Sequence, residues 1–429
     1  MSYITSISNV IRTKAAIQVA AKRYYGQLFT FPLFGEWVVL TTTKEHVKDQ
    51  LNAPESILSM EAATEELLQT HHTVGPLFCS ETYHIPAIKT ALNLNLANKL
   101  PDILDEMLLA FNEELNLSEG RNSKYRKLLN GFSDDIITGG AIIRMVVPGL
   151  LRPAVGWLFQ LVFGHHRRMT HLLAADITER QRNRETGNAH LVSVPTVMVP
   201  TQTDNDENPN DMLTWLMDQP WEGRTEHAPE SLAMRMLNVN FVALHTTSRA
   251  YIHALYHLVA QPEYVLILRS ELETYLDPKT PCVVQRGAGS IVNLDSFIKE
   301  SLRLNVHSAM WMPRLTLTPF EFSDGTIVQP NNFIATAITA VHEDETIYDH
   351  ATKFDGLRFS KTEGSVGVDL DVGMDATNPL WMQRLTGTSS SYLTFGGGRH
   401  IWYVLQHLWV LETYGESNSP GRFFCFPTN

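Results

Sequence analysis

Apolar residues recur at helical spacing through much of the chain, whereas strand-like runs are short. The longest helical stretch, residues 231–260, contains neither Gly nor Pro. Two runs rich in β-branched and aromatic residues, 28–31 and 37–42, are separated by Pro32 and Gly35, which is typical of a β-hairpin. Further helices are predicted at residues 1–25, 44–52, 60–70 and 148–184.

Polar stretches separate these elements. Residues 201–210 are too polar to pack and are predicted to form a surface loop. Asp211 follows, and its carboxylate is expected to cap the start of a helix. The run Phe-Ser-Asp-Gly-Thr at residues 322–326 predicts a second β-hairpin, whereas residues 360–390 predict a long irregular loop without recognisable chemistry.

The composition indicates a globular protein rather than a disordered chain. Of the 429 residues, 44% are apolar, which is enough to bury a sizeable core. The length exceeds that of a usual domain, yet large helical enzymes fold around one extended core, so a single domain over residues 1–429 is expected.

The charge pattern argues against nucleic acid as a partner. The formal net charge is −12, whereas phosphate binding needs clustered Lys and Arg. The basic group at residues 165–168 is interpreted as a solvated helix face. His253 and His257 stand one helical turn apart, but no third ligand accompanies them, so we interpret both as structural.

Cysteine usage and hydropathy limit the compartment. The chain has 3 cysteines, Cys79, Cys282 and Cys425, without the spacing of a disulfide framework or a zinc site, which indicates a reducing or cytosol-facing setting. The longest apolar region, residues 136–164, is interrupted by arginines and prolines and does not match a spanning helix. For this region, an amphipathic surface that touches a membrane remains an alternative interpretation. Residues 1–12 are too polar for a secretory signal.

A glycine-rich stretch at residues 393–401 carries the strongest signal. It reads Leu-Thr-Phe-Gly-Gly-Gly-Arg-His-Ile, and residues 420–424 read Pro-Gly-Arg-Phe-Phe. Joined through one cysteine, the two pieces resemble the haem-binding loop of the cytochromes P-450, in which the cysteine thiolate is the axial iron ligand. The resemblance implies haem b as cofactor. It places Phe395, Gly396 and Gly398 beside it, because glycine lets the main chain pass close to the porphyrin.

The cysteine itself is missing from this loop. By the family pattern its place falls on Trp402, and an indole cannot supply a thiolate. Residues 402–404 can be encoded TGG TAT GTN, which contains GTATGT, a common start of a fungal intron, and the codon of Ser419 can supply the closing AG. Removing this in-frame segment would leave a cysteine codon. We therefore interpret residues 402–419 as translated intron that interrupts the haem-binding loop.

A second part of the resemblance lies in the long helix. Residues 241–248, Phe-Val-Ala-Leu-His-Thr-Thr-Ser, resemble the oxygen-activating segment of the family's central helix. Thr247 takes the place of the family's threonine and Thr246 that of its acid, as in a His-Thr-Thr variant known in fungal subfamilies. The resemblance implies that both are catalytic, since a hydroxyl beside bound dioxygen can hold the water that delivers protons. The alternative is a helix whose threonines bond back to the preceding turn.

Further landmarks follow in the order that the family shows. Glu300 and Arg303 lie on one helix face and can pair. After them come the segments 311–314, 322–326, 342–348 and 354–359. The resemblance implies that Glu300, Arg303 and Arg358 form a buried structural charge network behind the haem loop, in which each charge must be paired.

Three basic residues are candidates to bind the haem propionates. The resemblance places Arg314 and His400 there, and it suggests Lys89 on a helix expected at residues 84–100. For Lys89 the alternative is an exposed lysine on a helix face, and for His400 it is a loop histidine with no ligand role. The helices at residues 148–184 would form the roof over the substrate cavity.

Together the motifs imply the cytochrome P-450 fold, which is mainly α, a large helical bundle with a small β-sheet portion. The expected function is a haem-dependent monooxygenase that inserts one atom of O2 into an apolar small molecule of a secondary-metabolite, terpenoid or lipid-like kind. Its electrons would come from NADPH through NADPH-cytochrome P-450 reductase.

An intact member would lie on the cytosolic face of the endoplasmic reticulum membrane, whereas this chain is expected to be soluble or peripheral. It is expected to be incomplete at both ends and to lack part of the helical bundle after Phe111. Two alternatives stay open. Without the thiolate, the literal chain would be a non-catalytic relative or a product that cannot fold. The other alternative is a haem protein with a different iron ligand such as His400, although His400 stands two residues before the ligand position of the loop.

Overall fold

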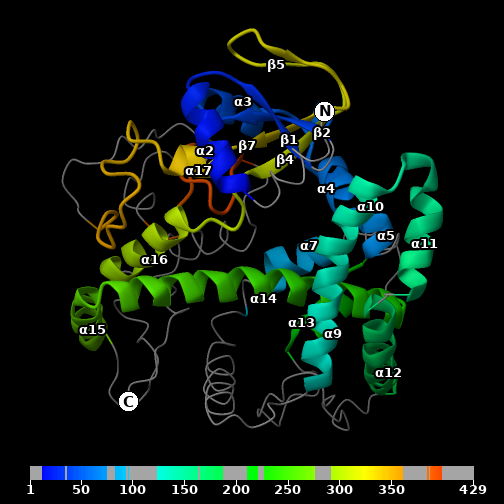
Figure 1. Cartoon of the computed structure of the whole chain (residues 1–429). Coiled ribbons are helices and arrows are strands. Elements are labelled where there is room, and N and C mark those ends of the chain that lie inside the picture. The colour runs from blue at the N-terminus through cyan, green and yellow to red at the C-terminus, as the bar shows by residue number, and fades with distance from the viewer. Residues whose placement is uncertain are drawn as a thin grey trace. The chain divides into compact units, whose positions relative to one another are not determined.

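The computed structural model (Figure 1) divides into two compact units. Unit 1 comprises Met1–Thr64 and Thr246–Phe424, and unit 2 comprises Glu65–His245 and Cys425–Asn429. The single domain expected from the sequence stays a prediction. The structure describes residues 12–33, 36–74, 83–92, 95, 123–162, 165–186, 210–220, 227–275, 291–360, 384–385 and 387–398.

Unit 1 contains a five-stranded sheet. Its strands are β1 (Phe29–Leu33), β2 (Glu36–Thr41), β3 (Leu58–Ser59), β4 (Trp311–Thr316) and β7 (Phe333–Thr336). Their order is β1-β2-β7-β4-β3 (Figure 1). The first predicted hairpin is confirmed, because β1 and β2 pair antiparallel with Phe29 opposite Leu40. β7 pairs parallel with β2 and antiparallel with β4, and all of its residues are buried at the centre of the sheet.

The second predicted hairpin is also confirmed. β5 (Phe320–Glu321) and β6 (Ile327–Val328) pair antiparallel, and Gly325 has a φ of 83° in the turn between them. Phe322 points inward and is 2% exposed. It anchors the hairpin to the sheet by packing against Leu58, Val328 and Ile334.

Unit 1 also contains several helices among its described residues. They are α2 (Thr13–Arg23), α3 (Lys44–Asn52), α15 (Glu263–Tyr275), α16 (Val292–Leu304) and α17 (Ile338–His342), with α4 (Met60–Leu68) crossing into unit 2. The helices predicted at 44–52 and 60–70 are thus confirmed. The carboxylate of Glu271 on α15 accepts the backbone N–H groups of Val292, Asn293 and Leu294 at 3.0, 2.8 and 2.9 Å. This cap fixes the start of α16.

The longest helix is α14 (Pro229–Ala260), which confirms the helix predicted at residues 231–260. It belongs to unit 2 up to His245 and to unit 1 from Thr246 onward. In the unit 1 part, His257 stacks on Phe354 with ring centroids 3.9 Å apart and accepts a hydrogen bond from Nδ2 of Asn305 at 2.8 Å. These contacts agree with a structural histidine.

The described residues of unit 2 form helices and the short turns between them. Its elements are α5 (Thr70–Thr73), α7 (His84–Pro86), η1 (Ala87–Leu92), α9 (Ser123–Asp134), η2 (Asp135–Gly139), α10 (Gly140–Val146), η3 (Gly149–Leu151), α11 (Arg152–Val162), α12 (His165–Glu185) and α13 (Met212–Met217). The predicted acidic cap of α13 is confirmed, since Asp211 accepts the N–H of Thr214 at 3.0 Å. The same carboxylate binds Arg180 of α12 at 2.7 and 2.9 Å.

Several predictions fall on residues that the structure does not describe. They include most of the loops at 201–210 and 360–390, the region after Phe111 and the segment 402–419 that is interpreted as translated intron. Among the described residues, no helix combines the length and the apolar character that crossing a membrane requires.

Candidate functional site

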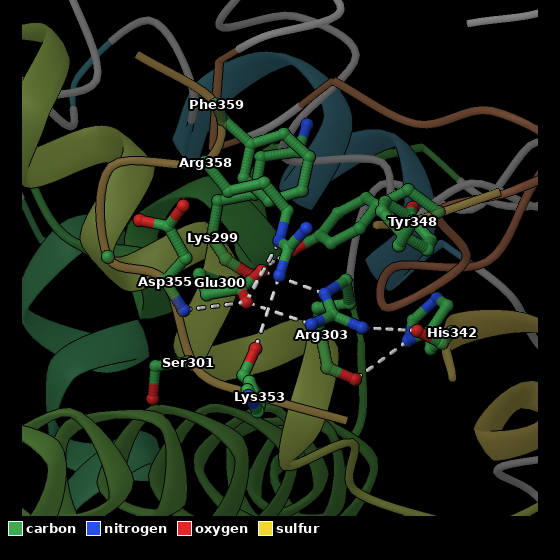
Figure 2. A network of polar contacts seen from close by, with 12 residues as sticks. Lys299, Glu300, Ser301, Arg303, His342, Tyr348, Lys353, Asp355, Arg358 and Phe359 are labelled. Atoms are coloured by element: carbon green, nitrogen blue, oxygen red, sulfur yellow. Dashed lines mark hydrogen bonds and ion pairs between the residues drawn. The ribbon is translucent and has the colours of Figure 1, made fainter. Parts of the chain in front are cut away.

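The charge network, made of Glu300, Arg303 and Arg358, lies in unit 1 at the C-terminal half of α16 (Figure 2). Nε of Arg303 binds one carboxylate oxygen of Glu300 at 2.7 Å, and Nη2 binds the other at 2.8 Å. Nε of Arg358 binds Glu300 Oε1 at 3.0 Å, and the backbone N–H of Asp355 donates to the same oxygen at 3.1 Å. The side chains of Glu300 and Arg303 are 0% exposed. One buried carboxylate therefore holds two guanidinium groups.

The remaining donors of the two arginines reach carbonyl groups. Arg358 donates to the carbonyl oxygens of Asp349 and Lys353 at 2.6 and 3.2 Å. Arg303 donates through Nη1 to the carbonyl oxygen of His342, and its guanidinium lies 4.7 Å from the ring centroid of Tyr348. Buried cations require such partners, because an unpaired charge would be too costly in a low dielectric.

The segment at residues 384–393 is tied to the charge network by three neighbouring side chains. Lys299 donates through Nζ to the carbonyl oxygens of Arg384 and Gly387 at 2.7 and 2.9 Å. The hydroxyl of Tyr348 donates to the carbonyl oxygen of Ser391 at 3.0 Å, and the backbone N–H of Leu393 donates to Nε2 of His342 at 2.9 Å. Lys299, His342 and Tyr348 were not among the site residues predicted from the sequence. Only Lys299 gave a signal in the sequence, because it directly precedes Glu300.

Burial sets the protonation of these three side chains. Desolvation lowers the pKa of His342 to about 3 and that of Lys299 to about 7. Desolvation also raises the pKa of the Tyr348 hydroxyl above its ordinary range. His342 and Tyr348 are therefore neutral at physiological pH.

The glycine loop, residues 393–398, continues directly from these ties. Gly396 and Gly398 have φ angles of 80° and 62°, a backbone conformation that residues with a side chain rarely adopt. A Cβ on Gly398 would lie 2.8 Å from the carbonyl oxygen of Leu51, so the loop also approaches α3 closely. Phe395 packs against the buried cluster of Tyr348, Ala351, Phe359 and Tyr392. Both the backbone conformation and the close approach thus need glycine at position 398.

Arg314 lies on β4, is 2% exposed and stands opposite Ile334 of β7. Its Nη1 donates to the carbonyl oxygen of Pro313 at 2.9 Å. The strand is irregular between Trp311 and Arg314, and Met312 has a φ of 56°.

Gln50 of α3, which the sequence analysis missed, supports this bend. Its Nε2 donates to the carbonyl oxygen of Met312 at 2.7 Å, and its Oε1 accepts the hydroxyls of Thr41 and Thr336 at 3.1 and 3.0 Å. A lone glutamine in an amphipathic helix gives no signal of such a role.

The other predicted site residues are less fully defined. Thr246 is half-buried and Thr247 is exposed on α14. Lys89 lies in η1 of unit 2, but its side chain is outside what the structure describes, as are His400 and Trp402. Their assigned roles stay predictions.

A haem requires cations for its propionates, a close backbone approach to its face and a ligand for its iron. The glycine loop, with its positive φ angles, and the buried cation of Arg314 suit the edge of a flat, carboxylate-bearing group. The iron needs a further ligand, and the chain carries Trp402 where the loop pattern calls for a thiolate. Among the described residues the donors suit the rim of the group, and the placing of Trp402 at the ligand position stays a prediction, so no chemical step through the iron follows from them.

Comparisons with known proteins agree with this geometry. A family model described as Cytochrome P450 matches residues 106–401. Cytochrome P450 monooxygenase 151 of Postia placenta is 28% identical over 455 residues, which cover 99% of this chain and 82% of the relative. Cytochrome P450 monooxygenase paxQ of Penicillium paxilli is 24% identical over 439 residues, covering 93% of this chain and 78% of that protein.

A solved structure supports the fold. A structure of a zebra fish cytochrome P450 with progesterone matches with a TM-score of 0.54 and 16% identity, over 93% of this chain and 91% of that one. The predicted fold class, mainly α with a small sheet, is thereby confirmed. Family membership implies a haem cofactor and monooxygenase chemistry. The chain belongs to the cytochrome P450 superfamily, among its fungal members.

Proposed function

We propose that the gene encodes a haem-dependent monooxygenase that inserts one atom of O2 into an apolar small molecule. Its electrons come from NADPH through a cytochrome P-450 reductase, and the substrate is terpenoid, lipid-like or another secondary metabolite. The observation that carries the proposal is the glycine loop, which His342 ties to the buried Glu300–Arg303 pair in a chain of this family. The fungal relatives named as monooxygenases support the same reaction class.

The chain's own residues have separate tasks in this proposal. Arg314 and His400, with Lys89, would neutralise the propionates of haem b, while Phe395, Gly396 and Gly398 form the surface against its face. A bound haem with a thiolate supplies the oxygen-activating chemistry. Thr247, assisted by Thr246, would hold the water that passes protons, and apolar side chains would exclude the bulk solvent from the substrate. The intact enzyme would act at the cytosolic face of the endoplasmic reticulum.

A second reading applies to the polypeptide in its literal form. Trp402 at the ligand place favours a non-catalytic product, because an indole donates no sulfur to iron. Both readings follow from the interpretation of residues 402–419 as translated intron: the spliced message encodes the enzyme and the unspliced message does not.

Sequencing the transcript across residues 395–424 tests the splice directly. A message in which a cysteine codon replaces residues 402–419 is expected. The protein from that message, once reduced and exposed to carbon monoxide, should show the red-shifted Soret band of thiolate-ligated iron. The matched control carries alanine in place of that cysteine and should lack the band. A message that keeps the segment everywhere, together with an active enzyme that retains Trp402, would contradict the proposal.

A further inference from the structure

His342, the last residue of α17, is buried with both ring nitrogens hydrogen-bonded. Nδ1 lies 3.0 Å from the carbonyl oxygen of Arg303, and Nε2 lies 2.9 Å from the backbone nitrogen of Leu393. The ring stacks on Tyr392, with centroids 5.4 Å apart and planes inclined by 11°. Figure 2 shows the contacts between His342 and Arg303. Through its second ring nitrogen the imidazole therefore connects the charge network to the first residue of the glycine loop.

The two bonds define one protonation state. The carbonyl oxygen of Arg303 can only accept, so Nδ1 of His342 carries the proton. The backbone N–H of Leu393 can only donate, so Nε2 is unprotonated. A protonated imidazolium would set two N–H groups against each other and break the bond to Leu393. Burial, together with the nearby guanidinium of Arg303, lowers the pKa of the ring and favours this neutral form.

Arg303 and His342 hold each other in place. The Arg303 guanidinium donates to the carbonyl oxygen of His342, while the His342 ring donates to the carbonyl oxygen of Arg303. Arg303 is itself fixed by its two bonds to Glu300. The position of Nε2 is therefore set by the charge network, without any contribution from a cofactor.

Leu393 passes this position on to the loop. Its N–H is held by His342, and its carbonyl oxygen accepts the N–H of Gly396 at 2.9 Å, which closes the turn. The ties from Lys299 and Tyr348 reach residues upstream, at Gly387 and Ser391. Of the three side chains that tie the segment to the network, His342 is thus the one bonded to the residue that opens the turn.

We propose that His342 is a positioning residue: as a neutral acceptor for the Leu393 N–H, it presets the glycine loop in its cofactor-binding shape before any cofactor binds. The identity of the loop as the cofactor loop rests on the proposed function. The presetting itself does not, because every contact in the argument lies within unit 1 and involves protein atoms alone.

Three substitutions separate the hydrogen bond from simple space filling. His342→Gln places an amide oxygen near the position of Nε2 and can still accept from Leu393. His342→Asn places its amide near Nδ1 and can still donate to Arg303, but it cannot reach Leu393. His342→Phe keeps a ring against Tyr392 and loses both bonds.

Hydrogen–deuterium exchange of the haem-free chain measures the outcome at residues 391–398. We expect exchange in this segment to be about tenfold faster in His342→Asn and His342→Phe, and near that of the parent chain in His342→Gln. Unchanged exchange in β2 and β7 shows that each variant has folded. Equal exchange in the Gln and Asn variants, or no acceleration in the Phe variant, would overturn the proposal.

A second measurement covers the case in which the variants lose their fold. Nitrogen-15 NMR of the histidine rings in the parent chain should show one imidazole with Nδ1 protonated and Nε2 unprotonated from neutral pH down to about pH 4. A ring that is protonated at both nitrogens in the folded chain would contradict the inferred bond. Because both experiments omit haem, a failure to bind haem or to oxidise a substrate would count against the proposed function alone.

Discussion

The charge network and the threonine pair of α14 lie in opposite environments. Glu300 and Arg303 are fully buried, and each charged atom of Glu300 has a named partner within 3.1 Å. Thr247 is exposed and Thr246 is only half-buried on α14. The first region shapes a loop through protein contacts, whereas the second would act only on something that binds beside it.

This difference separates folding from chemistry. A change in the network should appear as lost stability whether or not a cofactor binds, because buried charges lose their partners. A change at the threonine pair should leave folding intact and should appear only in turnover. Substitutions at Glu300, Gly398, His342 and Thr247 test this division, from the largest expected effect on folding to the smallest.

Replacing the shared carboxylate should have the largest effect. Glu300→Gln keeps the shape but leaves Arg303 and Arg358 without their counter-charge in a buried site. We expect the free energy of unfolding to fall by about 3–5 kcal/mol, measured by urea denaturation. Glu273→Gln, at an exposed position of α15, is the control and should change it by less than about 0.5 kcal/mol. Similar losses in the two variants would show that the charge network contributes no more to the free energy of unfolding than an exposed carboxylate does.

The glycine loop should respond next. Gly398→Ala combines a left-handed φ of 62° with a Cβ only 2.8 Å from the carbonyl oxygen of Leu51, so backbone must move. We expect the free energy of unfolding to fall by about 2–4 kcal/mol. Gly26→Ala is matched in conformation, with a φ of 80°, but its Cβ would meet no atom within 4 Å. The free energy of unfolding of the Gly26→Ala variant should fall by only about 1 kcal/mol. Equal losses would mean that the approach to Leu51 does not constrain the loop.

The acid side of the stability curve tests His342. Its ordinary pKa of 6.5 is lowered to about 3 in the folded chain, so between these values the unfolded chain binds more protons. The contribution of His342 to the free energy of unfolding is complete above pH 6.5 and is lost as the pH falls toward 3. His84 and His166, each with a pKa lowered to about 4, add to the same trend.

His342→Gln should therefore flatten part of this acid dependence. Urea denaturation of the parent and the variant at several pH values between 7 and 4 measures the difference. Parallel curves would show that His342 does not resist protonation in the folded chain.

The sequence alone predicted more of the framework than of its connections. Regular patterns identified both hairpins, the long helix and the Asp211 cap, because period and capping are local properties of the chain. The residues Glu300, Arg303 and Arg358 were named from a resemblance, and the structure brings them together.

The side chains that join this network to the glycine loop were not predicted. His342 and Leu393 are 51 positions apart, and Lys299 and Gly387 are 88 apart. A histidine at the end of a short helix has no periodic signal that reveals a partner so distant in the chain. Gln50 was missed for the same reason, because its three bonds join separate strands that meet only in the folded sheet.

Thr247 should show the smallest effect on folding and a large one on coupling. Its side chain is exposed on α14, so Thr247→Ala should change the free energy of unfolding by no more than about 0.5 kcal/mol. In the spliced, cysteine-bearing enzyme, loss of the hydroxyl should lower the product formed per NADPH consumed by about tenfold or more, since it removes the group that holds the proton-delivering water. Thr247→Ser keeps a hydroxyl and should restore the ratio, whereas a fall in stability without a change in coupling would place this residue with the structural network instead.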